Sequence, residues 1–232
     1  MPKRLVREVD IRGMKKIVIF IGPPGSGKGT QAKQLAQKFN YGHISTGDLL
    51  RALQTQTEIE PDEAEALKAM KQGKLVPDWL IYRLAFKAAE EHLNNGRGVV
   101  FDGAIRNTAQ AATYQEYFNG KNMSGDVVVV EIALSDEEAY NRLTKRRICK
   151  ECGAIIPWLP EFYSVSACPK CGGELATRAD DSEEVIRKRI AEQGNEALSP
   201  IREYYQKLNL LKVIDGGKAI AEVEKDVIAA IS

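Results

Sequence analysis

The feature that most constrains this chain is a glycine-rich loop placed between a buried strand and a helix. Residues 17–21 are continuously apolar and mostly β-branched, which is typical of a parallel strand buried on both faces. Residues 22–30 read Gly-Pro-Pro-Gly-Ser-Gly-Lys-Gly-Thr and meet the phosphate-loop pattern at Gly22, Gly27 and Lys28. Helical spacing of apolar side chains follows the loop. This order predicts a cradle of backbone N–H groups for an anionic phosphate.

Strands and helices alternate along the rest of the chain. Further buried strands are predicted at 99–102, 127–132 and 212–215, with a short one near 43–44. Helices are predicted at 63–70, 77–94, 109–118, 136–147 and 183–196, and Ser199–Pro200 begins another, with Pro in its first turn. The alternation and the loop together predict an α/β chain: a three-layer P-loop fold with a mostly parallel sheet.

The charge balance narrows the possible partners. Lys and Arg number 33 and Asp and Glu number 32, which argues against a nucleic-acid binder held mainly by bulk charge. No apolar run reaches the ~18 residues that cross a bilayer. Residues 1–16 lack the apolar stretch of a secretory leader. We therefore expect a cytoplasmic protein that binds neither a membrane nor a nucleic acid.

The chain's four cysteines fall into two close pairs. Fifteen residues separate Cys149-x-x-Cys152 from Cys168-x-x-Cys171, which is a zinc-binding spacing. Four thiolates make a closed tetrahedral site, so the metal is expected to be structural and to supply the folding free energy of this loop-rich segment. An iron–sulfur cluster or disulfides are alternatives. A nucleic-acid-binding ribbon is another, although the fifteen residues contain no Lys or Arg.

Other polar residues stand where phosphate chemistry needs them. Asp102 ends a buried strand, at the sheet edge where α/β proteins bind ligands, and is expected either to orient magnesium through water or to cap a helix. Transfer to a phosphate acceptor needs no carboxylate base, but it needs guanidinium groups that grip phosphate oxygens in pairs. His43 and His92 have no partner pattern and are expected to be structural or exposed.

The loop departs from the usual pattern at Gly29, which stands where most phosphate loops have the Ser or Thr that holds magnesium. With Thr30 after it, this sequence resembles the phosphate loop of nucleoside monophosphate kinases, and of adenylate kinases above all. Stretches that match the family follow in the same order at 44–51, at 73–78, at 101–103 with Arg106 and Gln110, and at 177–181 with Arg189.

The resemblance implies a role for each matching position. The implied catalytic residues are Lys28, Arg106, Arg146, Arg178 and Arg189. The implied ATP site comprises Gly22, Gly25, Ser26, Gly27, Lys28, Gly29, Thr30, Arg142, Arg146 and Lys218. The implied AMP site comprises Thr46, Arg51, Gly103, Arg106, Gln110, Arg178 and Arg189, and Asp102 is the implied water-mediated magnesium ligand. Asp180 and Asp181 resemble acids at the base of the family's lid, although Asp181 with Glu184 would also suit a helix cap.

The resemblance also implies an organisation and a reaction. The parts are an N-terminal extension (1–13), a core (14–44, 76–145 and 182–232), a monophosphate-binding insert (45–75) and a zinc-binding lid (146–181). The implied reaction converts ATP, bound with Mg²⁺, and AMP into two ADP, in a monomer whose two insertions swing freely. Two alternatives remain: a uridylate or cytidylate kinase, because Asn107 resembles that group, and a nucleotide-binding scaffold with a zinc ribbon. Thr46 and Gln110, by contrast, match the positions that recognise adenine.

One departure from the family concerns the loop before Arg106. The family usually has Phe-Pro there, often with a cis bond, whereas this chain has Ala104 and Ile105. A non-proline cis bond costs ~2.5–4 kcal/mol. We therefore predict a trans peptide between these two residues.

Overall fold

The computed structural model describes residues 13–56, 58–71, 76–177 and 181–232. The predicted N-terminal extension therefore lies outside the described residues, except for Gly13. Within the described part of the chain, no helix combines the length and the apolar character needed to cross a membrane.

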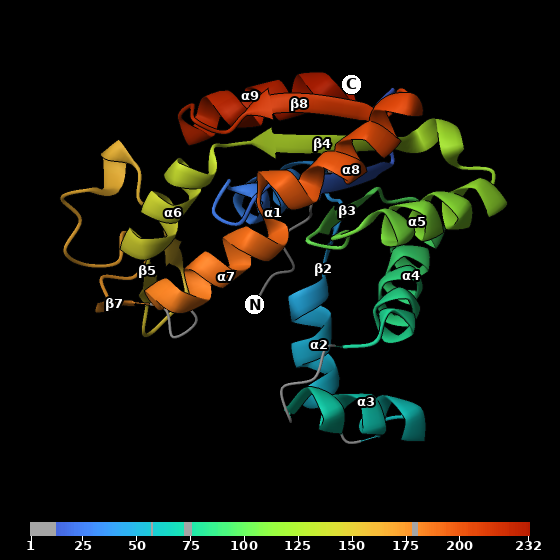
Figure 1. Ribbon diagram of the computed structural model, residues 1–232, viewed down its shortest axis with the longest axis horizontal. Helices are drawn as coiled ribbons and strands as arrows, with labels where there is room; N and C mark the ends of the chain where they lie inside the picture. The colour runs from blue at the N-terminus through green and yellow to red at the C-terminus, as the bar shows by residue number, and fades with distance from the viewer. Residues whose placement is uncertain (1–12, 57, 72–75, 178–180) are drawn as a thin grey trace, which may run out of the picture.

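A five-stranded parallel sheet forms the centre of the molecule (Figure 1). The strand order is β2-β3-β1-β4-β8, so strands far apart in the sequence lie side by side. The strands are β1 (Ile17–Ile21), β2 (Gly42–Ser45), β3 (Val99–Asp102), β4 (Val127–Ala133) and β8 (Leu211–Asp215). No residue of the central strand β1 is more than 2% exposed, as its unbroken apolar run predicts.

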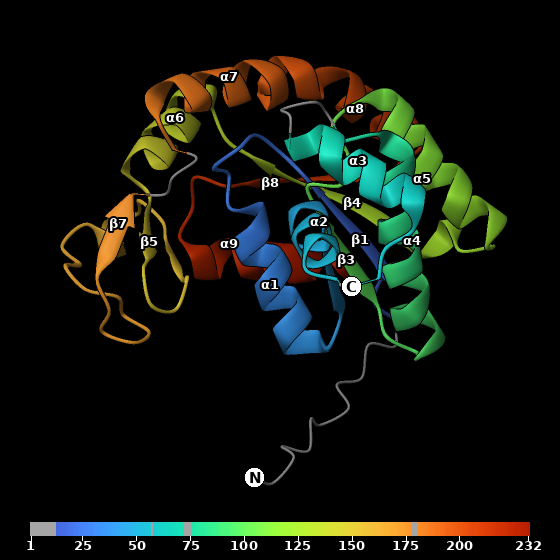
Figure 2. The ribbon, with the colours of Figure 1, turned by 90° about the horizontal axis from the view of Figure 1, so that it is seen from below.

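Helices cover both faces of this sheet, which makes three layers (Figure 2). One face is covered by α1 (Lys28–Phe39) and α9 (Ile220–Ile231), and the other by α4 (Asp78–Asn94), α5 (Thr108–Gly120) and α8 (Asn195–Lys207). Val18 and Phe20 of β1 pack on the first face, and Ile19 packs on the second. Successive side chains of a strand point to opposite faces, so one apolar strand serves two cores.

Two short helices project from the carboxyl edge of the sheet (Figure 1). They are α2 (Thr46–Gln54), which follows β2 directly, and α3 (Pro61–Lys71). A separate apolar cluster that includes Leu53, Leu67 and Leu80 joins them to α4. A 3₁₀ turn, η1 (Ser124–Asp126), precedes β4 at the opposite edge of the sheet.

The cysteine-bearing segment forms a second, smaller sheet at one end of the molecule (Figure 1). Its antiparallel strands lie in the order β6-β5-β7. The elements are β5 (Arg147–Cys149), β6 (Ile155–Ile156), η2 (Pro160–Phe162) and β7 (Leu175–Thr177). The segment joins α6 (Asp136–Lys145) to α7 (Glu183–Gln193), and these two helices contact each other.

The predicted fold class is confirmed, but some predicted boundaries are wrong. The helix predicted to reach residue 147 ends at Lys145, and Arg147 belongs to β5. Pro200 does not start a helix, because it lies inside α8. That helix starts at Asn195, where the extended backbone of Gly194 breaks the predicted helix 183–196 and the Asn195 N–H donates to Asp136 Oδ1. The cysteine-bearing segment was expected to be rich in loops, yet residues 147–177 contain three short strands.

Candidate active site

The glycine-rich loop lies between β1 and α1, at the carboxyl edge of the sheet. Gly22 has a φ of 138°, and a Cβ atom there would stand 2.4 Å from the Ile132 carbonyl oxygen, so only glycine fits. No side chain caps the N-terminus of α1, which leaves its first amides to face an anion. The Lys28 ammonium donates to the carbonyl oxygens of Gly22 (2.7 Å) and Pro23 (2.8 Å).

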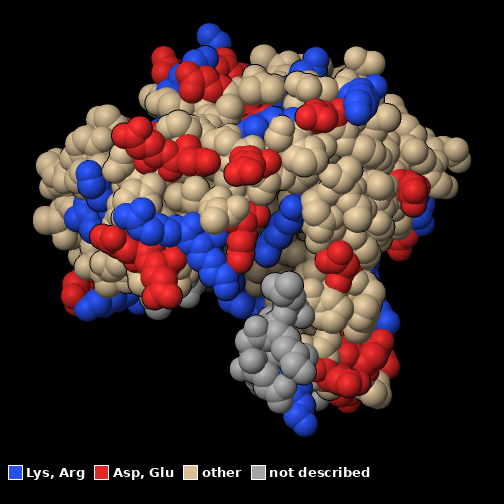
Figure 3. Space-filling view, viewed as in Figure 1, with Lys and Arg blue, Asp and Glu red and all other residues tan. Residues whose placement is uncertain are grey.

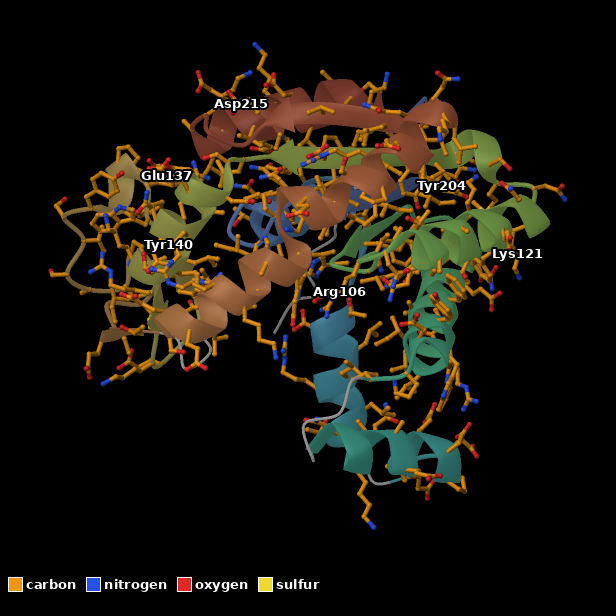
Figure 4. All side chains as sticks on the ribbon, in the orientation of Figure 1. Arg106, Lys121, Glu137, Tyr140, Tyr204 and Asp215 are labelled. Carbon is orange, nitrogen blue, oxygen red and sulfur yellow. The ribbon has the colours of Figure 1, made fainter. Side chains whose placement is uncertain are left out.

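Lys28 is the electrostatic centre of this site. The pKa of its ammonium is lowered to about 8, mainly by burial and also by the nearby positive charges of Arg189 and Arg106, while the Asp102 carboxylate opposes this shift. Side chains from three separate elements thus act on one lysine. A small pocket of about 60 Å³ opens between Gly22, Lys28 and Arg106. Figure 4 shows Arg106 just above α2.

Asp102 is placed for a ligand role by its neighbours. Its Oδ2 would lie 2.9 Å from a Cβ atom at position 29, so Gly29 leaves the room that a Ser or Thr would fill. The helix-capping alternative for Asp102 is wrong for the helix that follows it, because the Asn107 side chain caps α5 by accepting from the Gln110 N–H. His43, which was expected to be structural or exposed, lies with its Nε2 3.9 Å from Asp102 Oδ2. This proximity follows from the pairing of β2 with β3, which the local sequence pattern does not reveal.

Residues of the predicted AMP site meet around the loop after β3. The Thr46 hydroxyl donates to the Gly103 carbonyl at 2.8 Å. The Arg106 N–H donates to Gln110 Oε1 at 2.7 Å. The described residues contain no cis peptide bond, which confirms the trans peptide predicted before Arg106. Arg51 is not in this group of contacts, since its largely exposed guanidinium pairs with Asp48.

The predicted ATP side is built by α6 and by the loop after β8. Both pack on the glycine-rich loop: a Cβ at Gly25 would lie 3.0 Å from Leu143, and one at Gly216 would lie 3.2 Å from the Ser26 carbonyl oxygen. The buried Arg142 donates to the Gly216 carbonyl at 2.9 Å. Arg142 therefore ties these two elements together.

Two further residues of the predicted ATP site form ion pairs with side chains outside this group of contacts. The Lys218 ammonium is engaged by Asp226 at 2.7 Å. Arg146 reaches across to the base of the cysteine-bearing segment, where it meets Asp181.

Asp181 gathers two of the predicted catalytic arginines. Its side chain is fully buried and accepts a two-pronged pair of hydrogen bonds from Arg146, at 2.8 and 2.6 Å. Arg189 lies 3.6 Å from the same carboxylate. The helix-cap alternative for Asp181 is wrong, because Ser182 caps α7. Arg178 and Asp180 lie outside the described residues.

Basic side chains border one side of this arrangement, with acidic side chains beside them. Figure 3 shows Lys and Arg side chains gathered over α7, at the edge of the hollow that separates it from α2 and α3. Acidic side chains cover α3 instead. The guanidinium groups on this side are suited to nucleotide phosphates, although Glu183 lies 3.9 Å from Arg187 on the same helix.

The four cysteines converge as their spacing predicts. Their Sγ atoms all lie within 4.8 Å of one another, and Cys149–Cys171 and Cys152–Cys168 are separated by 3.5 and 3.6 Å. A tetrahedral zinc ion with bonds of ~2.3 Å holds its sulfurs ~3.8 Å apart. All four thiols are free, so the disulfide alternative does not hold. These four residues could hold a metal ion.

The site combines a glycine-rich cradle and a buried lysine with arginines from α7 and from the loop after β3, and with a carboxylate at the end of a strand. These features define a P-loop phosphotransferase. The family model for adenylate kinase matches residues 20–210 of the chain. An adenylate kinase of Methanocella arvoryzae is 40% identical over 219 residues, which cover 92% of this chain and 97% of that protein. An adenylate kinase of Archaeoglobus fulgidus is 37% identical, with the same coverage of both chains. The chain belongs to the adenylate kinase family.

Proposed function

We propose that this chain transfers the terminal phosphoryl group of ATP reversibly to AMP, giving two ADP. The observation that carries the proposal is the buried Lys28 ammonium inside the glycine-rich loop, with Arg106 and Arg189 close enough to lower its pKa. Three cations around one point neutralise the charge that spreads over a phosphoryl group in transfer. Membership of the adenylate kinase family supports the same reaction.

The roles follow from the positions of the side chains. Backbone amides at the start of α1 and the Lys28 ammonium bind the phosphates of the donor. Arg106 holds the acceptor phosphate from the loop after β3, and Arg146 and Arg189 exchange the Asp181 carboxylate for the transferring group when the lid closes. Arg51 and Arg178 take part in the same way, by the family resemblance. No general base is required, since the acceptor oxygen is already anionic.

Two metal ions belong to this proposal. Asp102 would hold Mg²⁺ through water, in the room that Gly29 leaves, and Mg²⁺ would supply charge neutralisation at the donor phosphates. The four cysteines would hold a structural Zn²⁺, and their sulfur separations suit its tetrahedral geometry. Residues 45–75 and 146–181 would then act as the moving parts, with the remainder as core.

The partners proposed are ATP, AMP and ADP only. We further propose that the chain works as a cytoplasmic monomer, without a membrane or a nucleic acid. The near-balanced net charge of +1 supports the absence of a nucleic-acid partner.

A pyrimidine acceptor is the second candidate within the family. The feature that favoured it was Asn107, and this residue has a structural reason to be there, since its side chain caps α5. Thr46 and Gln110 instead line the acceptor loop, with both side chains close to fully buried. Their placement favours adenine, because a site built to hydrogen-bond one base leaves polar groups unpaired with another.

The test compares AMP, UMP, CMP and GMP as acceptors in a coupled assay that follows nucleoside diphosphate formation. We expect AMP to have the highest kcat/KM. Thr46→Ala should reduce the preference for AMP over UMP by roughly tenfold, the discrimination expected from lost contacts to a base. Thr113→Ala, which removes a hydroxyl from the exposed side of α5, is the matched control and should change nothing. A wild-type protein that prefers UMP or CMP would overturn the proposal.

A further inference from the structure

The Gln110 side chain makes two hydrogen bonds to other residues of the protein. Its Oε1 accepts from the Arg106 N–H at 2.7 Å, and its Nε2 donates to Asp78 Oδ1 at 2.8 Å. The first partner is a backbone donor and the second is a carboxylate acceptor. Neither partner tolerates a flipped amide, because oxygen would then face oxygen and N–H would face N–H. The two bonds therefore fix which end of the Gln110 amide is oxygen and which is nitrogen.

The places of Asp78 and Gln110 in the fold help to hold the Gln110 amide in one orientation. Asp78 is the first residue of α4, and Gln110 lies in the first turn of α5, where only 8% of it is exposed. A carboxylate binds amide donors more strongly than a neutral acceptor does. The Asp78 side chain therefore gives the Gln110 amide a directional contact that does not depend on a bound base.

Among the residues that the structure describes, the fixed amide retains one N–H and one lone pair without a partner. Adenine presents a matching pair, because its N6 amino donor stands beside a ring-nitrogen acceptor on either exposed edge. A 6-oxo purine presents an acceptor oxygen in place of that amino group. An amide free to rotate could serve both kinds of base, whereas a fixed amide serves only one.

We propose that Asp78 is a specificity-determining residue that fixes the Gln110 amide, so that the acceptor site admits 6-amino bases and rejects 6-oxo bases. Asp78 acts through Gln110 and is a positioning residue, not a catalytic one. This inference rests on the proposed function in one respect, namely that Gln110 faces the acceptor base.

The experiment uses AMP and IMP, two purine monophosphates that differ only by the amino or oxo group at position 6. For wild type, Asp78→Ala and Asp78→Asn, kcat/KM is measured with each acceptor at saturating Mg-ATP. Asp78→Ala removes the acceptor of the Gln110 bond and should lower the AMP-to-IMP preference roughly five- to tenfold, within the range of a lost base-edge contact. Asp78→Asn retains a carbonyl oxygen at the same place and should keep most of the preference.

The two variants separate the hydrogen bond from a merely structural effect. Both remove the same negative charge from the first turn of α4, so a general loss of helix stability would affect them equally and would not change a ratio of substrates. An unchanged AMP-to-IMP ratio in Asp78→Ala overturns the inference, and so does an equal loss of the ratio in Asp78→Asn. Failure of the proposed function is distinguishable, because it would show as a wild type without preference for AMP over UMP, CMP and GMP.

Discussion

The glycine-rich loop and the cysteine-bearing segment are stabilised in opposite ways. The loop follows β1, a strand buried on both faces, and packs against α6 and the loop after β8. Among its described residues, the cysteine-bearing segment has a cluster of three buried residues, Cys149, Ile156 and Cys168, and two of them are cysteines. Apolar burial shapes the first region, whereas we expect the second to depend on a metal ion held by its four cysteines. We therefore expect one active site to combine a half that is rigid on its own with a half whose order depends on the metal that its cysteines could hold.

The largest effect on activity is expected from a substitution in the glycine-rich loop. Lys28→Ala should lower kcat by at least ~100-fold, the scale of losing one electrostatic donor to the transition state. The melting temperature should change little, since the lysine is desolvated in the folded protein and its removal relieves that penalty. Steady-state kinetics and thermal denaturation measure both. Lys38→Ala, at an exposed ion pair on the same helix, is the control. A folded Lys28→Ala protein with near-normal turnover would contradict the assignment.

Metal removal addresses the second half. Chelation should make residues 149–171 sensitive to protease while the far-ultraviolet circular dichroism of the core persists. Activity should fall about tenfold, because Arg146 adjoins β5 and needs a closed lid to reach the transferring phosphate. Added zinc should restore it, and elemental analysis should find about one zinc per chain. Cys168→Ser should lower the melting temperature, with Ser166→Ala as the control. Absence of zinc together with a protease-resistant segment would refute this.

The smallest expected effect is a pH dependence of kcat/KM, which arises from Lys28 in the glycine-rich loop and not from the cysteine-bearing segment. The pKa of Lys28 is lowered to about 8, so its ammonium loses its proton as the pH rises past that value. The cation that binds phosphate is then lost, and kcat/KM should fall about fivefold between pH 8 and pH 9. The same break should persist in zinc-free protein, because Lys28 lies outside the metal segment. A break that moves with metal content would show that the two halves are coupled.

Local patterns predicted most of the core. The apolar runs gave β1, β3 and β4, since a buried strand needs such a sequence whatever its neighbours are. The family, the phosphate loop and the convergence of the cysteines are likewise confirmed. The roles of individual residues in the ATP and AMP sites stay predictions.

Tertiary contacts decided what local patterns missed. The helix α6 ends without Gly or Pro, because Arg146 turns to the buried Asp181 and Arg147 donates to the carbonyls of Phe162 and Val165. His43 gave no signal because its neighbour Asp102 lies on another strand. Pro200 looked like a first-turn proline, yet helix α8 had already begun at Asn195.

Gly29 also limits the routes by which this sequence can evolve. A single change to Ser or Thr would put a Cβ atom 2.9 Å from Asp102 Oδ2 and push that carboxylate aside. The cost falls on the position of the carboxylate, not on the strand beneath it. Shortening Asp102 first would remove the proposed ligand before a hydroxyl could replace it. The two positions therefore constrain each other, because a side chain at position 29 requires the Asp102 carboxylate to take another position.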